Sequence, residues 1–329
     1  MEDARHLTTR DIGRAMEDFQ QKRRLIEQGQ LTSWKRRGRG AFTVEHVPFH
    51  RTLLQTMFRA GWLRARGERN ARNAVVRTVR FTFDSLPAAF CGFTLLHLSD
   101  IHADGLTGLS ENLSRRLQDL QVDLCVLTGD YRYKSRGPSH DVYPHMEKIL
   151  AAINARYGIV GVLGNHDSIE KVPVLERLGV TMLMNQSLPV SHDGDTIWLV
   201  GLDDPHYYGC DDLPGALHGV PEEVFKVLLV HTPELVAEAA AHGIDLYLCG
   251  HTHGGQICLP WLGPVISGAN CPRRYVRGAW RHKRMQGYTS AGVGVSVVPV
   301  RFFCPPEIVL IELRCTRQHA HPSALVSAE

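Results

Sequence analysis

Short apolar runs recur through the middle of the chain, and a cluster of polar residues follows each of them. Five such runs stand out, at 95–98, 124–127, 159–163, 227–230 and 246–249. Runs of this length, bounded by polar and glycine residues, are typical of buried strands. Segments with helical spacing lie between them, at 112–120, 144–156, 172–178 and 233–242. Alternating strands and helices predict an α/β fold, a layered β-sandwich flanked by helices.

The beginning of the chain follows a different pattern. Apolar residues recur at helical spacing over 8–30 and again over 48–62, where arginines surround the apolar stripe. We therefore expect a basic, largely helical extension over residues 1–73. A strand at 74–83 then opens a catalytic domain that we place at 74–316, and we expect a disordered tail over 317–329.

Charge is divided unevenly between these parts. Residues 1–80 hold 18 Lys and Arg against 8 Asp and Glu, which is +10, and the rest holds 19 against 26, which is −7. A basic leading segment suits an anionic surface, such as lipid headgroups or nucleic acid, although a solvated helical face has the same composition. An amphipathic stretch such as 48–62 either lies in a membrane interface or packs on the domain.

Eight cysteines are present without a Cys-x-x-Cys pair, which argues against a structural zinc site and for free thiols in a reducing compartment. Neither an apolar signal region nor a run of about 18 apolar residues is visible. We therefore expect a cytoplasmic protein that associates peripherally with the inner membrane.

The polar clusters after the apolar runs supply metal ligands. Ligands bind beyond the carboxyl ends of strands in open α/β sheets, so these side chains should meet at one edge. They are sufficient for two divalent ions, and carboxylate with imidazole favours Mn, Fe or Zn. Two metals held together indicate phosphoryl chemistry. The expected metal ligands are Asp100, His102, Asp130, Asn165, His231, His251 and His253.

The order of these motifs resembles the calcineurin-like metallophosphoesterase family. The series D-x-H, G-D, G-N-H-D, H and G-H-x-H extends over 100–253, and the resemblance covers roughly Phe93 to Leu313. Segments 254–256 and 299–307 are similar to a bacterial branch of small phosphodiesterases and UDP-diacylglucosamine pyrophosphatases. Asp130 is the natural bridging ligand, because one carboxylate can hold two cations. The resemblance places Asp100, His102 and His253 with Asp130 at one ion, and Asn165, His231 and His251 with it at the other.

Two neighbouring residues are expected to act in catalysis. His166 is the candidate that protonates the leaving oxygen, and Asp167 is expected to orient its imidazole by a hydrogen bond. A metal-bridging hydroxide would attack directly, without a covalent enzyme intermediate. The predicted reaction is hydrolysis of a phosphodiester or pyrophosphate bond.

The substrate is less visible in the sequence. Arg132 is expected to contact a phosphate oxygen, with an ordinary surface arginine as the alternative. An apolar loop at 257–266 precedes Arg273 and Arg274, which suits a lipid-linked substrate such as UDP-diacylglucosamine unless the loop packs on the sheet. A nuclease or nucleotide phosphodiesterase is the alternative function, and a non-catalytic metal-dependent scaffold is a further one. Residues 1–80 hold no recognisable nucleic-acid-binding motif, so nucleic acid is not an expected partner, and the oligomeric state stays open.

Overall fold

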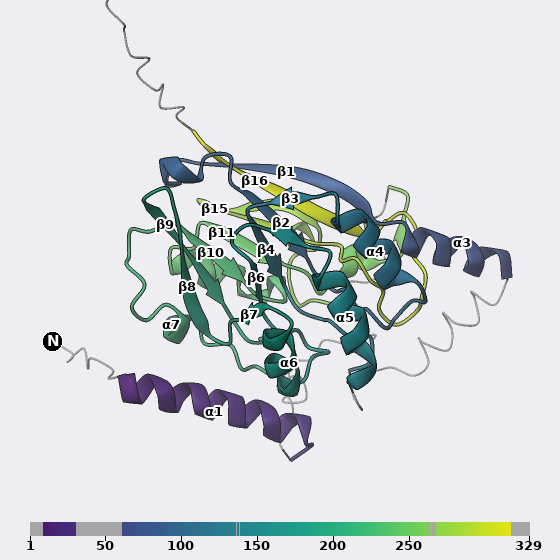
Figure 1. Ribbon diagram of the computed structural model, residues 1–329, viewed down its shortest axis with the longest axis horizontal. Helices are drawn as coiled ribbons and strands as arrows, with labels where there is room; N and C mark the ends of the chain where they lie inside the picture. The colour runs from purple at the N-terminus through teal and green to yellow at the C-terminus, as the bar shows by residue number, and fades with distance from the viewer. Residues whose placement is uncertain are drawn as a thin grey trace, which may run out of the picture.

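Two six-stranded sheets pack face to face in the computed structural model, which describes residues 9–30, 61–135, 137, 139–261, 263–264 and 268–316 (Figure 1). The first sheet has the order β1 (Val75–Phe83), β16 (Glu307–Cys315), β2 (Thr94–Leu98), β4 (Leu124–Leu127), β6 (Ile159–Gly161) and β7 (Val180–Met182). The second has the order β14 (Gly278–His282), β15 (Met285–Thr289), β11 (Leu246–Cys249), β10 (Lys226–Leu229), β9 (Asp195–Gly201) and β8 (Gln186–His192).

The strands that precede the candidate ligands run parallel within each sheet. In the first sheet β2, β4, β6 and β7 are parallel, with Leu96 opposite Cys125 and Val126 opposite Val160. In the second sheet β9, β10, β11 and β15 are parallel. Parallel strands bring their carboxyl ends to the same edge, so each sheet presents its ligand loops together.

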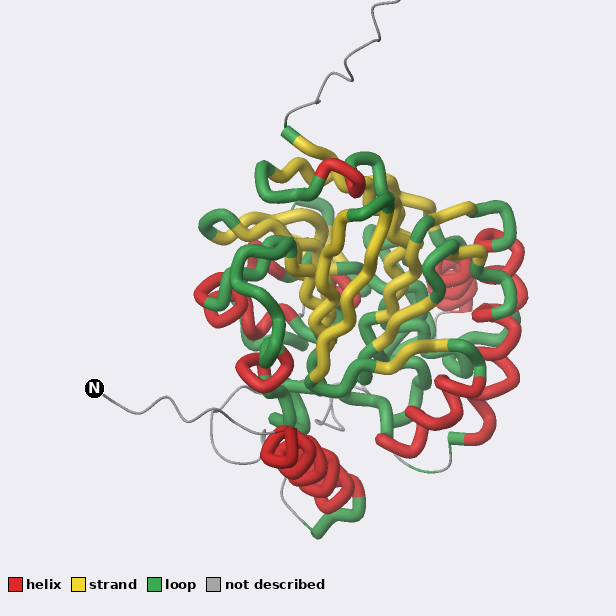
Figure 2. The backbone as a smooth tube through the Cα atoms, turned by 60° about the vertical axis from the view of Figure 1, so that its left-hand side comes forward, coloured by secondary structure: helices red, strands yellow, loops and turns green. Residues whose placement is uncertain are grey.

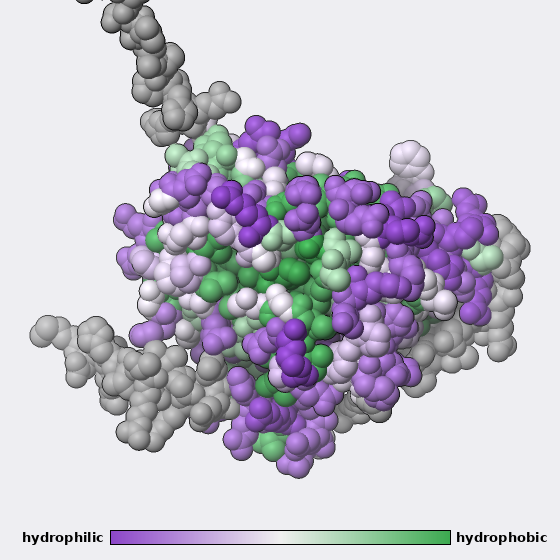
Figure 3. All heavy atoms as spheres, viewed as in Figure 1, coloured by the Kyte–Doolittle hydropathy of each residue, from purple (hydrophilic) through white to green (hydrophobic). Residues whose placement is uncertain are grey.

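Side chains of the central strands are buried on both faces of each sheet. On β4, Leu124 and Val126 pack between the two sheets, whereas Cys125 and Leu127 face the helices. On β10, Val227 and Leu229 also lie between the sheets. Strands covered on both faces produce the continuous apolar runs seen in the sequence. Figure 3 shows hydrophobic residues gathered near the middle of one face and mostly hydrophilic residues around its rim.

Helices cover the outer faces of the sandwich (Figures 1 and 2). Helices α4 (Leu109–Leu117), α5 (Tyr143–Leu150) and α6 (Val172–Arg177) pack on the first sheet, and α7 (Leu213–Ala216) and α8 (Val236–Ala241) pack on the second. The predicted layered α/β sandwich is thereby confirmed. The helix expected over 144–156 ends early, because β5 (Asn154–Ala155) pairs with β3 (Gln121–Val122). A second small ribbon joins β12 (Cys258–Leu259) to β13 (Gly263–Pro264).

Strand β16 was not expected from the sequence. It lies between β1 and β2, parallel to the former and antiparallel to the latter, so the end of the domain inserts next to its beginning.

Two helices of the leading segment are described. Helix α1 (Thr9–Glu27) agrees with the helix expected over 8–30, and Figure 2 shows it alongside the body of the sandwich. Helix α3 (Gly61–Arg72) precedes β1. Most of the amphipathic stretch at 48–62 lies outside the described residues. Within the described ranges, no helix combines the length and apolar character needed to cross a bilayer.

Candidate metal centre

All seven expected ligands follow strands, and all seven are buried. Asp100 and His102 follow β2, Asp130 follows β4, and Asn165 follows β6. On the second sheet, His231 follows β10, and His251 and His253 follow β11. The two sheets therefore contribute ligands to one site from opposite sides.

The backbone at the ligands is locally strained. Asp100, His102, Asp130, His251 and His253 have φ values between 41° and 67°, in the left-handed region that non-glycine residues rarely adopt. Such conformations persist where the surrounding structure enforces them, and they cluster at functional sites.

Close approach of the loops requires two glycines. A Cβ at position 164 would lie 2.2 Å from Oδ1 of Asp130, and one at position 250 would lie 2.2 Å from Oδ2 of Asp100. Glycine at both positions lets the backbone pass directly beside a ligand carboxylate.

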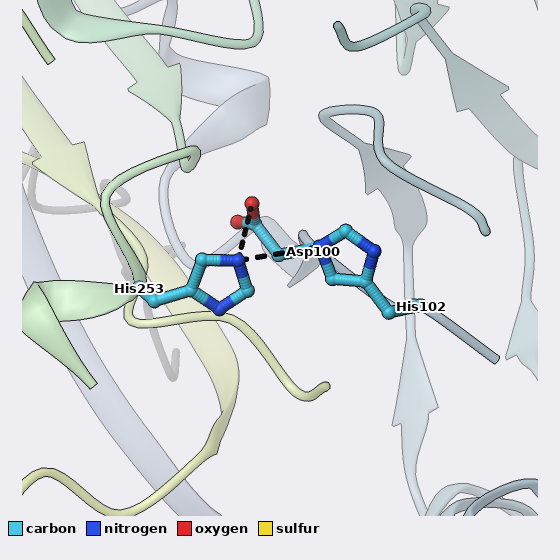
Figure 4. A group of neighbouring side chains, drawn as sticks. All are labelled: Asp100, His102 and His253. Atoms are coloured by element: carbon cyan, nitrogen blue, oxygen red, sulfur yellow. Dashed lines mark hydrogen bonds and ion pairs between the residues drawn. The ribbon is translucent and has the colours of Figure 1, made fainter. Parts of the chain in front are cut away.

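One group of ligands comprises Asp100, His102 and His253 (Figure 4). Nε2 of His253 lies 3.2 Å from Nε2 of His102 and 3.5 Å from Oδ1 of Asp100. The imidazole of His102 is oriented by its Nδ1, which donates to the carbonyl of Arg132 at 2.6 Å. The Asp100 carboxylate accepts from the main-chain N–H of His251, with both oxygens at 3.0 Å.

The second group of candidate ligands comprises Asp130, Asn165, His231 and His251. Nε2 of His231 lies 3.3 Å from Oδ2 of Asp130 and 3.0 Å from Oδ1 of Asn165. Nδ1 of His251 lies 2.9 Å from the same Asn165 oxygen. Asp130 also belongs to the first side of the site, because its Oδ2 is 3.6 Å from Nε2 of His102. The shared carboxylate thus lies between the two groups.

The chemistry of these donors fits divalent cations. Nδ1 of His231 donates to the Thr128 carbonyl at 2.7 Å, so the neutral ring points a lone pair at the oxygens of Asp130 and Asn165. Burial disfavours the imidazolium form, yet the carboxylates led by Asp130 raise the pKa of His231 to about 10. The carboxylates around His231 therefore favour a positive charge beside them. A bound metal ion would supply this charge while the His231 ring stays neutral.

His166 lies beside the ligands but makes different contacts. Its main-chain N–H donates to Oδ1 of Asp130 at 2.8 Å, and its Nδ1 donates to the carbonyl of Tyr133 at 2.7 Å. The ring is 5.0 Å from that of His102. Because Nδ1 binds the Tyr133 carbonyl, Nε2 is the ring nitrogen left to meet a reacting group, and the expected proton transfer stays a prediction.

The expected role of Asp167 needs correction. Its carboxylate accepts from the main-chain N–H groups of Asp130 at 2.7 Å, Gly164 at 3.0 Å and Tyr131 at 3.1 Å, and it pairs with Lys171 at 3.6 Å. The carbonyl of Tyr133, rather than Asp167, orients His166. A buried carboxylate satisfies several N–H groups at once, so Asp167 joins the loops that carry Asp130 and Asn165.

The predicted substrate residues are placed differently from one another. Arg132 is buried and donates to the carbonyls of Lys134 and Gly137, the latter at 2.7 Å. Arg273 donates to the carbonyl of Pro264 at 3.3 Å, and Arg274 lies over the ring of Tyr275 at 4.7 Å. Of these three arginines, only Arg132 borders the cleft described next.

A cleft of about 1000 Å³ adjoins Asn165 and His166. The carboxylates of Glu27 and Glu170 border it, and cationic and aromatic side chains form another part of its lining, which suits a phosphorylated substrate with a large substituent. These side chains are Arg24, Arg132, Lys134, Tyr133, Tyr207 and Tyr208.

Two supporting arginines escaped the reasoning from sequence. Arg23 and Arg301 are fully buried, and both contact the loops that carry the ligands. Their sequence neighbourhood is merely basic or proline-rich, and nothing in the local pattern distinguishes a buried arginine from an exposed one.

Two sheets that focus carboxylate, imidazole and amide ligands on one buried edge define a metal-dependent hydrolase. The sequence model of the calcineurin-like phosphoesterase family matches residues 93–255. An uncharacterized metallophosphoesterase of Bacillus subtilis (strain 168), YkuE, is 31% identical over 257 residues, which cover 74% of this chain and 87% of that protein.

Two relatives with assigned activities are also similar. The phosphodiesterase YaeI of Escherichia coli (strain K12) is 29% identical, with 67% of this chain and 82% of the relative covered. The UDP-2,3-diacylglucosamine pyrophosphatase LpxG of Chlamydia muridarum (strain MoPn / Nigg) is 25% identical, with 70% and 86% covered. The chain belongs to the calcineurin-like metallophosphoesterase family and is a metal-dependent phosphoester hydrolase.

Proposed function

We propose that the protein hydrolyses a phosphodiester or pyrophosphate bond in a lipid-linked substrate at an anionic membrane surface. The observation that carries the reaction type is the position of Asp130 between two groups of ligands. Two divalent ions bound there would polarise the phosphoryl oxygen and lower the pKa of a water molecule between them.

Each residue then has a defined task. Asp100, His102 and His253 would hold one ion, Asn165, His231 and His251 would hold the other, and Asp130 would contribute to both sites. His166 carries the proton that the leaving oxygen needs, while its backbone N–H keeps Asp130 oriented. Because water is the nucleophile in this scheme, no enzyme-bound phosphoryl group forms.

Exposed apolar side chains support a lipid-linked substrate. Segment 257–259 runs beside Phe302, with the N–H of Cys258 donating to the Phe302 carbonyl at 2.9 Å. Leu259 is 49% exposed, Trp261 is fully exposed, and Phe303 is 66% exposed. Leu259 and Trp261 follow His253 closely in the chain, and Phe303 precedes Cys304, whose Sγ donates to the His253 carbonyl at 3.3 Å. Exposed apolar side chains near the expected ligand His253 suit contact with acyl chains. The activity of LpxG, whose substrate is a diacylated UDP-sugar by name, is consistent with this proposal.

The reaction type is tested with metal analysis and an assay on bis-p-nitrophenyl phosphate, with and without Mn²⁺. Hydrolysis in ¹⁸O-labelled water should place a single label in the product phosphate, and trapping of a phosphorylated protein would contradict direct attack. A panel of nucleotide diesters, UDP-sugar lipids and phospholipid headgroup esters then identifies the substrate class. Preference for the nucleotide diesters would overturn the lipid-linked substrate but not the reaction type.

Membrane association is tested separately by co-sedimentation with anionic and neutral liposomes. We expect pelleting with anionic vesicles that weakens as salt is added, because screening removes about 1 kcal/mol per surface-facing Lys or Arg. The variant with Leu259→Ser and Trp261→Ser should pellet less and retain hydrolysis of bis-p-nitrophenyl phosphate. Equal, negligible pelleting of the wild type with both vesicles would contradict the proposal.

A further inference from the structure

We propose that helix α1 is a working part of the metal centre and that its Arg23 is a positioning residue for Asn165 and His166. The inference rests on the proposed function, since it assigns Asn165 to a metal and His166 to proton transfer. Helix α1 lies outside residues 93–255, which the family's sequence model matches, so this support comes from a segment beyond that match.

Arg23 contacts both ends of residues 164–167, which we call the catalytic loop because they include Asn165 and His166. One guanidinium nitrogen of Arg23 donates to the carbonyl of Asp167 at 2.6 Å and to that of Gly164 at 3.2 Å. These two carbonyls flank Asn165 and His166 in the sequence. A single planar group therefore fixes the backbone on either side of a metal ligand and the proposed proton donor.

The other side of the guanidinium is held just as firmly. Arg23 forms a buried ion pair with Asp203, a second pair with Glu27 at 3.1 Å, and lies 3.9 Å over the ring of Tyr208. Burial disfavours the charge, but these neighbours, Asp203 foremost, raise the pKa of Arg23 above its ordinary value. A planar, permanently charged fork with this many partners has little freedom to move.

The rest of the last turns of α1 docks on the same region. Ile26 is buried against Tyr208 and Cys210, and Lys22 donates to the carbonyl of Gly209. Glu27 accepts from the main-chain N–H of Ile169 at 2.9 Å, just beyond the catalytic loop. Docking therefore combines apolar burial with hydrogen bonds, which distinguishes it from a loose surface contact.

The same helix also forms a wall of the cleft. Arg24, Ile26 and Glu27 of the helix, with Gln28 directly after it, border the cleft that adjoins Asn165 and His166. Loss of α1 from its position would therefore loosen the loop and open the cleft together. Loosening of the loop, caused by the loss of Arg23, would weaken metal binding. Opening of the cleft, caused by the loss of its wall residues, would weaken substrate binding.

The test compares Arg23→Met with Arg23→Lys and with Gln21→Ala, whose side chain is exposed on the same helix. Methionine keeps much of the length and apolar contact but cannot bind the carbonyls. Lysine keeps a positive charge but lacks the fork that reaches Asp203 with one nitrogen and the two carbonyls with the other. Each full-length variant is titrated with Mn²⁺ by calorimetry, and amide hydrogen exchange is followed across residues 164–169 in the metal-free protein.

We expect Arg23→Met to weaken the affinity for one Mn²⁺ about 10–100-fold, the range found for groups that orient metal ligands. Its amides at 164–169 should exchange faster than in the wild type. The Mn²⁺ affinity and amide exchange of Arg23→Lys should lie between those of Arg23→Met and the wild type. Gln21→Ala should match the wild type in both measurements. In assays kcat should fall more than KM rises, because the change acts on ligands and proton donor rather than on substrate contacts.

Wild-type affinity and wild-type exchange in Arg23→Met would overturn the proposal. Should that variant unfold, Arg23→Lys decides the question, because it retains the positive charge. The titration and exchange data need no turnover. A wild type that binds Mn²⁺ but hydrolyses no phosphoester would therefore refute the proposed function while leaving the role of Arg23 measurable.

Discussion

Arg23 and Arg301 support opposite sides of the metal centre, and they do so with different partners. Arg23 reaches the Asn165 side from helix α1 and pairs with carboxylates as well as carbonyls. Arg301 supports the His253 side from within the domain. Among the described residues, its partners are carbonyls and the His253 ring, without a carboxylate in ion-pair distance. It donates to the carbonyls of Ala291 at 2.7 Å and Gly294 at 2.6 Å.

The charge environment of the two arginines differs accordingly. Burial lowers the pKa of Arg301 despite nearby Cys304 and Asp100, whereas the neighbours of Arg23 raise its pKa. Arg301 acts as a fixed cross-link among carbonyls at 253, 291–294 and 304 inside one domain. Arg23 is the contact through which a separate helix supports the site. A buried guanidinium group can therefore cross-link loops within the sandwich, as Arg301 does, or attach a separate helix to it, as Arg23 does.

The largest effect is expected from replacing Asp130, the carboxylate that both groups of candidate ligands share. Asp130→Asn keeps the shape and the oxygen that accepts from the His166 N–H, but it removes the charge between the two groups of ligands. We expect the loss of at least one metal and a fall in kcat beyond the roughly 10–100-fold typical of groups that only orient ligands. Metal content and turnover measure it, with the exposed Asp119→Asn as the control. Full metal content in Asp130→Asn would refute the shared-ligand arrangement.

Replacement of Arg301 should lower the free energy of unfolding more than replacement of Arg23. Arg301→Met leaves several buried carbonyls without a donor, and each unsatisfied group costs about 1–3 kcal/mol. We therefore expect a fall of several kcal/mol in the free energy of unfolding, measured by urea denaturation of the metal-free protein. Arg23→Met should lose less, because α1 can detach and expose its former partners to water. An equal loss in both variants would erase the distinction drawn between the two arginines.

Helix α3 packs on the segment that carries Arg301, and a substitution at Gly67 tests this packing. Gly67 packs so closely that an added Cβ would lie 2.6 Å from Cβ of Val300, and its carbonyl accepts from the main-chain N–H of Arg301 at 3.1 Å. Alanine in a helix is ordinarily about 1 kcal/mol better than glycine. Gly67→Ala should instead destabilise the protein by about 1–3 kcal/mol through overpacking.

Thermal unfolding of Gly67→Ala, compared with the exposed Arg66→Ala on the same helix, decides the sign. A stabilised Gly67→Ala would mean that α3 does not press on the segment carrying Arg301.

Much of the sandwich and its ligand set follows from local sequence. Apolar runs covered on both faces marked β4 and β10, and the polar residues after them marked the candidate ligands that the structure brings together. Strand β16 escaped because its pairing with β1 and β2 joins residues more than 200 positions apart. The contacts of Arg23 and the role of Asp167 in joining two loops escaped for a related reason. Many of their partners are backbone carbonyls and N–H groups, and the identity of a side chain does not reveal such contacts in the sequence.

A third buried basic side chain, His97, carries no charge in the folded protein and so extends the comparison to pH. Its Nε2 pairs with the hydroxyl of Thr128 at 2.8 Å, and burial lowers its pKa to about 3. The unfolded chain, with an ordinary histidine pKa near 6.5, takes up a proton that the folded protein refuses. The contribution of neutral His97 is therefore complete above about pH 6.5 and declines by about 1.4 kcal/mol per pH unit as the pH falls toward 3.

Substitution with glutamine isolates this contribution, because glutamine can still pair with Thr128 but does not titrate. Unfolding free energies of metal-free wild type and His97→Gln should converge, or cross, as the pH falls from 6.5 to 4. The exposed His140→Gln should run parallel to the wild type throughout. Curves that remain parallel for the wild type and His97→Gln would show that the acid sensitivity arises elsewhere, such as in the Asp203 and Glu27 carboxylates that pair with Arg23.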